Sequence, residues 1–298
     1  MKNLKICKPN NFWIAIIIGI ITATSVGASA QSHSFKVEKT GKGQDILFIP
    51  GLTCDGAVWD QAVSQLSKSY TCHVVTLPGF AGQKPIEVTN GFTPVIRTEL
   101  IEYIQANKLI KPIIIGHSLG GFLALDIMSA EPDLIDRAII VDGLPFFAAI
   151  QNPNATEESM KEASKNMSAM NNNMPPEQYA IQQRMILGAM ITDSTNIETA
   201  FQWGAASDIA TVNQAVYDMN TTDLRDDLAK IKSPVLVLGA YVAYKQYGVT
   251  KEMTMNNFAN QFKELEGVKI ELSDIGRHFI MWDDPQFFLN QTTAFLAK

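Results

Sequence analysis

Six short apolar segments, separated by stretches with helical periodicity, constrain the fold of this chain more than any other feature. Each carries apolar residues at consecutive positions, as expected of a strand buried on both faces in a parallel sheet. The alternation of strand and helix predicts an α/β protein with a doubly wound, mostly parallel sheet, closed by a C-terminal helix over residues 284–298. The six predicted strands are residues 46–50, 72–77, 112–116, 137–143, 234–239 and 268–273.

The alternation stops between residues 146 and 222, where the sequence is polar and helical and contains seven of the twelve methionines. We predict an all-helical lid here, inserted after the strand that ends near Asp142 into a core made of residues 31–145 and 223–298. Methionine-rich surfaces adapt to apolar ligands of varied shape, although the same methionines are equally typical of ordinary helix cores.

The first thirty residues carry the pattern of a secretory signal peptide. Lysines at positions 2, 5 and 8 precede an apolar run, and small residues at 28–30 match a cleavage site after Ala30. A retained membrane anchor is the alternative. We expect cleavage and export to the periplasm or the medium, without a stable membrane anchor afterwards, because no later apolar run is long enough to span a bilayer.

Charge and cysteine content exclude several classes of function. The formal net charge is −6 and no basic stripe is present, which argues against nucleic acid and against an anionic membrane surface as partners. No spacing typical of a metal site occurs, and we expect neither a metal nor a cofactor. Export would permit a disulfide between Cys54 and Cys72. Their predicted positions at opposite ends of neighbouring parallel strands are too far apart for one, so we expect two free, buried thiols.

The most specific motif is Gly-His-Ser-Leu-Gly at residues 116–120, directly after an apolar strand and directly before a helix. A nucleophile on such a strained turn needs flanking glycines, because side chains there would meet the neighbouring backbone. The motif predicts Ser118 as a nucleophile whose developing charge the helix N-terminus supports. The alternative is a structural glycine turn.

With this motif the chain resembles the α/β-hydrolase family, specifically serine hydrolases with a helical lid, over nearly all of its length after residue 30. Residues 48–60 are similar to the family's oxyanion loop, residues 76–83 to the loop after the next strand, and residues 274–288 to the loop of the catalytic histidine. The resemblance implies that the backbone N–H groups of Leu52 and Leu119 form the oxyanion hole.

The order of catalytic residues in this family is serine, acid, histidine, so the general base must follow Ser118. The sequence holds four histidines, and only His278 follows the serine at a useful distance; His33, His73 and His117 do not. We therefore predict His278 as the base. His117 is a candidate for lining the substrate pocket, with a structural role as its alternative.

The acid is less obvious, because no Asp or Glu occurs between Lys232 and Lys251, where this family usually carries it. Family members with that loop empty can place the acid one strand earlier, and Asp142 ends that strand at the edge where doubly wound folds bind ligands. We predict Asp142. The alternatives are a turn-capping role for Asp142, a Ser-His dyad without an acid, or one of five other carboxylates: Asp208, Asp218, Asp223, Asp226 and Asp274.

A serine nucleophile argues against relatives that attack with aspartate, such as haloalkane dehalogenases. Serine, histidine and an oxyanion hole together indicate acyl transfer through an acyl-enzyme. We expect an exported serine hydrolase acting on small-molecule esters of small or medium apolar acyl groups. Amidase, aminopeptidase and lactonase activities use the same groups, and an aminopeptidase would need lid carboxylates such as Glu157 and Glu158. A non-catalytic small-molecule binding or sensor protein is the alternative from another class. None of these patterns specifies an oligomeric state.

Overall fold

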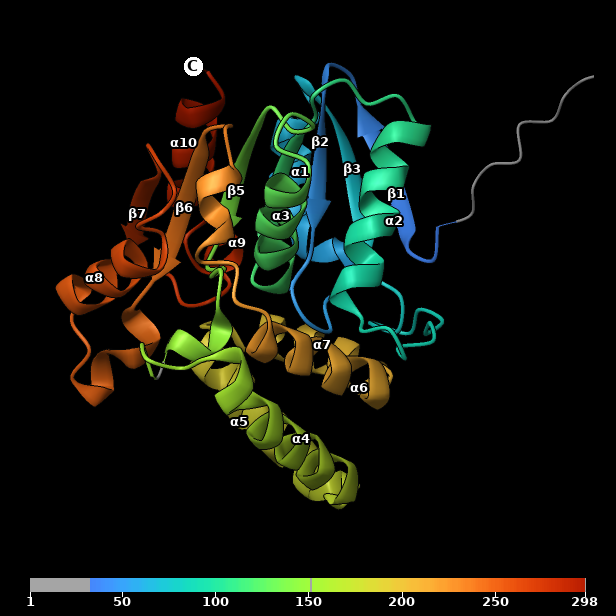
Figure 1. Cartoon of the computed structure of the whole chain (residues 1–298), viewed down its shortest axis with the longest axis vertical. Helices are drawn as coiled ribbons and strands as arrows, with labels where there is room; N and C mark the ends of the chain where they lie inside the picture. The colour runs from blue at the N-terminus through green and yellow to red at the C-terminus, as the bar shows by residue number, and fades with distance from the viewer. Residues whose placement is uncertain (1–32, 151, 298) are drawn as a thin grey trace, which may run out of the picture. The chain divides into compact units, whose positions relative to one another are not determined.

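The structure is a computed structural model that describes residues 33–150 and 152–297. Its centre is a seven-stranded sheet in the order β1-β3-β2-β4-β5-β6-β7 (Figure 1). All strand pairs are parallel except β1 with β3, which is antiparallel. The strands are β1 Lys36–Gly41, β2 Gln44–Ile49, β3 Tyr70–Thr76, β4 Ile113–His117, β5 Arg137–Val141, β6 Val235–Ala240 and β7 Lys269–Ser273. The doubly wound, mostly parallel sheet predicted from the sequence is thereby confirmed, including all six predicted strands.

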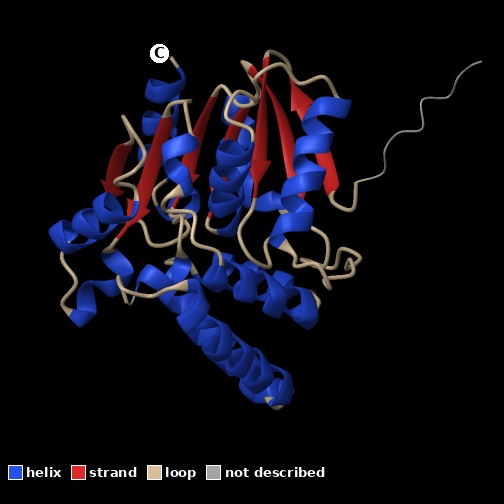
Figure 2. Cartoon of the chain, in the orientation of Figure 1, coloured by secondary structure: helices blue, strands red, loops and turns tan. Residues whose placement is uncertain are grey.

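Helices cover both faces of the sheet, as Figure 2 shows. Alternate residues of each central strand enter opposite clusters: Leu47 and Ile49 pack with α2 and α3, whereas Ile46 and Phe48 pack with α1 and α10. This two-sided burial is the reason that the strands are apolar at consecutive positions. The helices of this part are α1 Asp60–Leu66, α2 Thr93–Ala106, α3 Leu119–Ala130, α8 Lys251–Gln261, α9 Ile280–Asp283 and α10 Pro285–Leu296.

Residues 146–222, called the helical insertion below, lie between β5 and β6 and contain helices and no strand among their described residues. The helices α6 and α7 lie below the carboxyl ends of the central strands, and α4 and α5 extend away from the sheet (Figure 1). The α-helices of the insertion are α4 Glu157–Asn173, α5 Pro176–Met190, α6 Ser194–Ala205 and α7 Ile209–Thr221.

A buried carboxylate attaches the insertion to the core. Oδ2 of Asp218, on α7, accepts hydrogen bonds from the N–H groups of Phe92 (2.7 Å) and Thr93 (2.8 Å) at the start of α2. The side chain of Gln214 donates to the other oxygen at 2.7 Å. These N–H groups lack intrahelical partners, so Asp218 satisfies donors that would otherwise be buried and unpaired.

Both described cysteines are free and buried. Burial raises the pKa of the Cys54 thiol to about 12 and that of the Cys72 thiol to about 11. The predicted signal peptide at residues 1–30 lies outside the described residues. Within the described part of the chain, no helix has the length and apolar character to cross a membrane.

Candidate active site

Ser118 sits on a strained turn between β4 and α3, with φ 51° and ψ −114°. Its N–H donates to the carbonyl of Val141 at 2.9 Å, so the turn stays attached to β5. A Cβ added to Gly116 would lie 2.2 Å from the carbonyl oxygen of Gly120, and one added to Gly120 would lie 2.1 Å from that of Ile49. The two glycines of the motif are thus required because backbone segments meet at this turn. This is the strand-to-helix turn that the Gly-x-Ser-x-Gly pattern predicts.

The two predicted oxyanion donors lie on the two segments that meet at Ser118. Leu119 is the first residue of α3, so its N–H has no intrahelical acceptor. Leu52 follows β2, and no hydrogen bond found among the described residues is donated by its N–H. A Cβ on the neighbouring Gly51 would lie 3.3 Å from Cβ of Ser118. The loop after β2 therefore passes directly beside the nucleophile.

Asp142 and His278 are joined by a short hydrogen bond. Nδ1 of His278 donates to Oδ2 of Asp142 at 2.6 Å, and the two side chains are 21% and 14% exposed. The other carboxylate oxygen, Oδ1, accepts from the N–H of Ala240 at 2.9 Å. Asp142 also has a positive φ of 47°, and its N–H donates to the carbonyl of Leu238 at 2.7 Å. The end of β6 thus holds the carboxylate that β5 supplies.

The structure does not form every contact of a triad. No hydrogen bond between Ser118 Oγ and Nε2 of His278 is found among the described residues. The ring of His278 lies 4.7 Å, between centroids, from the ring of His117, the residue before the nucleophile. Such catalytic hydrogen bonds are often long without a substrate and tighten in the reacting complex. Because Nδ1 donates to Asp142, Nε2 is the ring atom of His278 that can accept a proton when the imidazole is neutral.

His117 lies beneath the site. Its side chain is 1% exposed, and Nε2 donates to the main-chain carbonyl of His278 at 3.1 Å. Nδ1 is buried without a partner. Burial, and then the nearby His278, hold the pKa of His117 well below its usual value, so the ring is neutral. The structure does not support the prediction that His117 binds substrate, because the residue is almost completely buried; the structural alternative fits.

The other candidate carboxylates are occupied elsewhere. Asp208 caps α7, and Asp218 binds the start of α2. Asp274, four residues before His278, forms an ion pair with Lys251 at 2.6 Å. Asp223 pairs with Arg225, and no hydrogen bond from Asp226 to His278 is found in the described part of the chain. Asp142 is thus the carboxylate that the structure brings to His278.

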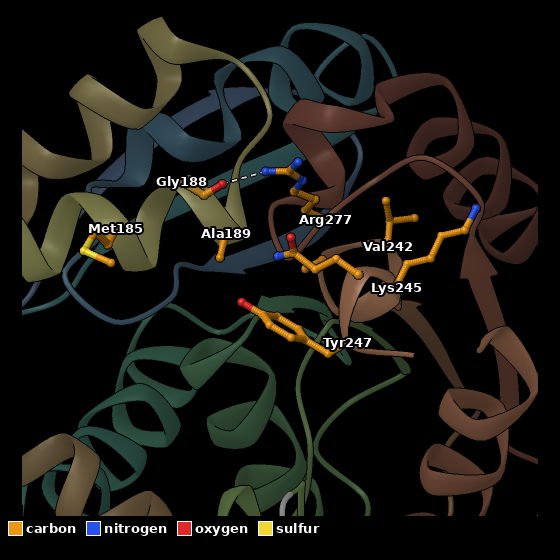
Figure 3. Close-up of a pocket in the computed structure, with 9 residues that line it drawn as sticks. Met185, Gly188, Ala189, Val242, Lys245, Tyr247 and Arg277 are labelled. Atoms are coloured by element: carbon orange, nitrogen blue, oxygen red, sulfur yellow. Dashed lines mark hydrogen bonds between the residues drawn. The ribbon is translucent and has the colours of Figure 1, made fainter. Parts of the chain in front are cut away.

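Two cavities lie between the helical insertion and the loop after β6, and the Asp142–His278 pair lines the smaller of them. The smaller has a volume of about 150 Å³, the larger about 640 Å³, and both are bordered by Ala189 and Ala243. The smaller is lined by Asp142, Ile186, Ala189, Met190, Ala240, Ala243, Tyr244 and His278. Figure 3 shows the larger, lined by Met185, Gly188, Ala189, Val242, Ala243, Lys245, Gln246, Tyr247 and Arg277.

The sequence analysis did not single out these cavity residues, with the exception of Asp142 and His278. The segment η4 (Val242–Tyr247) is the loop that lacks an acid, and only its missing carboxylate drew attention to it. Arg277 stands beside His278 and is the one Lys or Arg among residues 274–288, which is the signal that could have singled it out. Among the described residues, no group of three or more His, Cys, Asp or Glu side chains is placed to hold a metal ion.

Comparison with known proteins is consistent with this geometry. The sequence model of the "Alpha/beta hydrolase family" matches residues 46–291. A "Pimeloyl-[acyl-carrier protein] methyl ester esterase" of Aeromonas salmonicida is 27% identical over 209 residues, which cover 68% of this chain and 78% of that protein. The Vibrio cholerae protein of the same name is 26% identical over 215 residues, covering 67% and 76%.

Solved structures share the fold at lower identity. An esterase from Exiguobacterium antarcticum superposes with a TM-score of 0.71 at 16% identity, covering 89% of this chain and 96% of that one. The enol-lactonase from Burkholderia xenovorans superposes with a TM-score of 0.70 at 15% identity, with the same two coverages. At this identity the likeness concerns the fold alone.

Proposed function

Because this chain belongs to the alpha/beta hydrolase family, we propose that it hydrolyses carboxylic esters through an acyl-enzyme formed on Ser118. The observation that carries the proposal is the 2.6 Å hydrogen bond from Nδ1 of His278 to Asp142. This bond fixes the neutral ring in the tautomer whose Nε2 accepts a proton, and the ring of His278 lies against that of His117, the residue before Ser118. Esterase relatives support ester hydrolysis as the reaction class.

In the proposed mechanism, Nε2 of His278 accepts the proton of Ser118 Oγ as the oxygen attacks the ester carbonyl. Asp142 holds the ring in the Nδ1–H tautomer and stabilises the imidazolium. The N–H groups of Leu52 and Leu119 receive the negative charge of the tetrahedral intermediate, and such a donor typically contributes about 10²–10³ in kcat. His278 then protonates the leaving alkoxide, and a water molecule repeats the sequence to release the acid.

The helical insertion is proposed to act as a lid over this site. Its helix α5 supplies Ile186, Ala189 and Met190 to the wall of the smaller cavity, opposite His278. Apolar side chains make up most of that wall, which suits the acyl chain of a small or medium ester. The relatives' name describes a methyl ester of a medium-length acyl group. For this chain we propose only that the substrate ester joins a small alcohol to an acyl group of medium length.

Charge in the site favours an ester over the substrate of an aminopeptidase. That substrate carries an ammonium group, which needs an available carboxylate. Glu157 accepts from the N–H of Asp223 at 2.8 Å, and Glu158 pairs with Lys161 at 2.6 Å. Neither lines either of the two cavities described above, and the one carboxylate that does, Asp142, is already bound to His278 and Ala240.

We also propose that the protein is exported, on the basis of the pattern at residues 1–30. Mass spectrometry of the protein isolated from its host should find a chain that begins at Gln31. A chain that retains residues 1–30 would contradict the proposal.

Covalent labelling tests the function. Intact mass of the purified protein is measured after exposure to a small fluorophosphonate, with Ser118→Ala as control. We expect a single adduct that is absent from the control, followed by hydrolysis of short and medium p-nitrophenyl esters. Absence of an adduct on the wild type would contradict the proposal and favour a small-molecule binding protein on the same fold.

A further inference from the structure

The larger cavity is bordered by a cation without a counter-ion. Arg277 is partly buried, and its Nη1 donates to the carbonyl of Gly188 at 2.6 Å (Figure 3). The same atom donates to the carbonyl of Ile191, at the end of α5, at 3.2 Å. A guanidinium has five N–H donors, so the Nε and Nη2 donors remain for another acceptor. No carboxylate lies within ion-pair distance of it among the described residues.

The lining of the larger cavity is basic, whereas the protein as a whole is acidic. The formal net charge is −6, yet no Asp or Glu lines the larger cavity. Lys245 also borders it, although in Figure 3 its ammonium extends away from Arg277. Removing a guanidinium partly from water without a carboxylate is unfavourable, and an anionic ligand would offset that cost. Capping the last carbonyls of α5 explains two donors of Arg277 and leaves the others unexplained.

Arg277 is also close to His278, the proposed general base. It directly precedes His278, and its cavity shares Ala189 and Ala243 with the cavity lined by Asp142 and His278. A ligand that extends through both cavities would bring one end to His278 and the other to Arg277.

We propose that Arg277 binds a carboxylate on the substrate, so that the preferred substrates are esters with a free carboxylate, such as monoesters of dicarboxylic acids. The inference rests on the proposed ester hydrolysis and names its substrate class. A planar guanidinium is suited to this role, because its parallel N–H groups match the two oxygens of a carboxylate.

The test measures binding in the Ser118→Ala background, so that no turnover interferes. Monomethyl and dimethyl esters of succinic, adipic and suberic acid are titrated by calorimetry, and the ratio of the two Kd values is taken at each chain length. We expect the monoester to bind about tenfold more tightly at the length that fits, the effect of one charge-assisted pair. The ratio cancels any loss of affinity that affects both esters equally.

Arg277→Gln should reduce this ratio to about one. The matched control is Arg137→Gln, at the opposite end of β5, since Arg137 is also partly buried and donates to a main-chain carbonyl, that of Phe295 (3.0 Å); this variant should keep the ratio. If Arg277→Gln does not fold, Arg277→Lys serves, because it keeps the charge but loses the paired N–H groups, and the ratio should fall below that of the parent.

Three results would overturn the inference: a ratio of about one at every length in the parent, a ratio that persists in Arg277→Gln, or no binding of any monoester at millimolar concentration. Failure of the proposed function is seen separately. An absent fluorophosphonate adduct would reject the serine mechanism, whereas the binding ratio would still decide whether Arg277 recognises a carboxylate.

Discussion

The N–H of Ala240 donates a 2.9 Å hydrogen bond to Oδ1 of Asp142. Ala240 ends β6, the strand after which the sequence has no acid, and Asp142 follows β5 beside it. Because the two strands are parallel neighbours, with Val141 opposite Leu238, their carboxyl ends lie together. The backbone of one strand can therefore orient the carboxylate of the other. His278 thus meets a carboxylate that is held at the end of β6, although β5 supplies it.

Asp142→Asn is expected to lower kcat for a p-nitrophenyl ester by about 10⁴-fold while the protein remains folded. The amide no longer holds His278 in the required tautomer and cannot stabilise the imidazolium. Initial rates and circular dichroism provide the measurement. Asp274→Asn is the control, since Asp274 lies in the same loop but pairs with Lys251, and its rate should stay near that of the wild type. Near-normal turnover by Asp142→Asn would reject Asp142 as the acid.

His117 should make the protein less stable as the pH falls. Burial, and then the nearby His278, hold its folded-state pKa well below the usual 6.5, so its contribution is fully present above that pH. Below it the unfolded chain binds a proton that the folded protein does not. From about pH 7.5 to about pH 5.5 the wild type should lose up to about 1.4 kcal/mol more unfolding free energy than His117→Gln.

Urea unfolding at the two pH values measures this difference. His33→Gln, which keeps His117, should retain the pH dependence of the wild type. If His117→Gln shows that same dependence, the buried ring is not the group responsible.

Two glycines should respond oppositely to alanine. At Gly116 the added Cβ would meet the carbonyl of Gly120, a backbone contact that no side-chain rotation relieves, so we expect a loss of about 3 kcal/mol. At Gly188, inside α5, nothing lies within 4 Å of the added Cβ, and alanine should stabilise by about 0.5–1 kcal/mol. Urea unfolding of both variants gives the comparison. A similar change at the two positions would contradict the described turn.

Asp218→Ala should loosen the attachment of the helical insertion. It removes the acceptor of the N–H groups of Phe92 and Thr93, and leaving such buried donors unpaired costs about 2–4 kcal/mol in total. Asp193→Ala is the matched control: Asp193 caps α6 of the same insertion at the surface and should cost about 1 kcal/mol. Urea unfolding and hydrogen exchange in α7 are measured for both variants. An equal loss of unfolding free energy in the two would show that Asp218 contributes no more than a surface helix cap.

One strand, at the edge of the sheet, was not predicted from the sequence. Strand β1 was not predicted, because it pairs on one side only and most of its residues are exposed, so it lacks the consecutive apolar residues of the central strands. The central strands could be predicted because burial on both faces of the sheet favours an apolar residue at every position.

The cavities could not be predicted for a different reason. Arg277 donates to Gly188, 89 positions away in the sequence, and the wall opposite α5 is the loop after β6. These neighbours come together only through packing of the insertion against the core. Local patterns report on the burial of a segment, not on which distant segment it faces.

The sequence by itself determined the fold class, because strand and helix periodicities are local. It predicted the strained turn at Ser118, because glycines around a serine between strand and helix have few other uses. It also narrowed the base to one histidine and favoured one carboxylate among several. Only the tertiary structure decided that Asp142 meets His278, that His117 is buried, and that the guanidinium of Arg277 borders the larger cavity without an ion-pair partner among the described residues. Each of those depends on side chains from separate strands and helices converging, and that convergence is set by the packing of the whole domain.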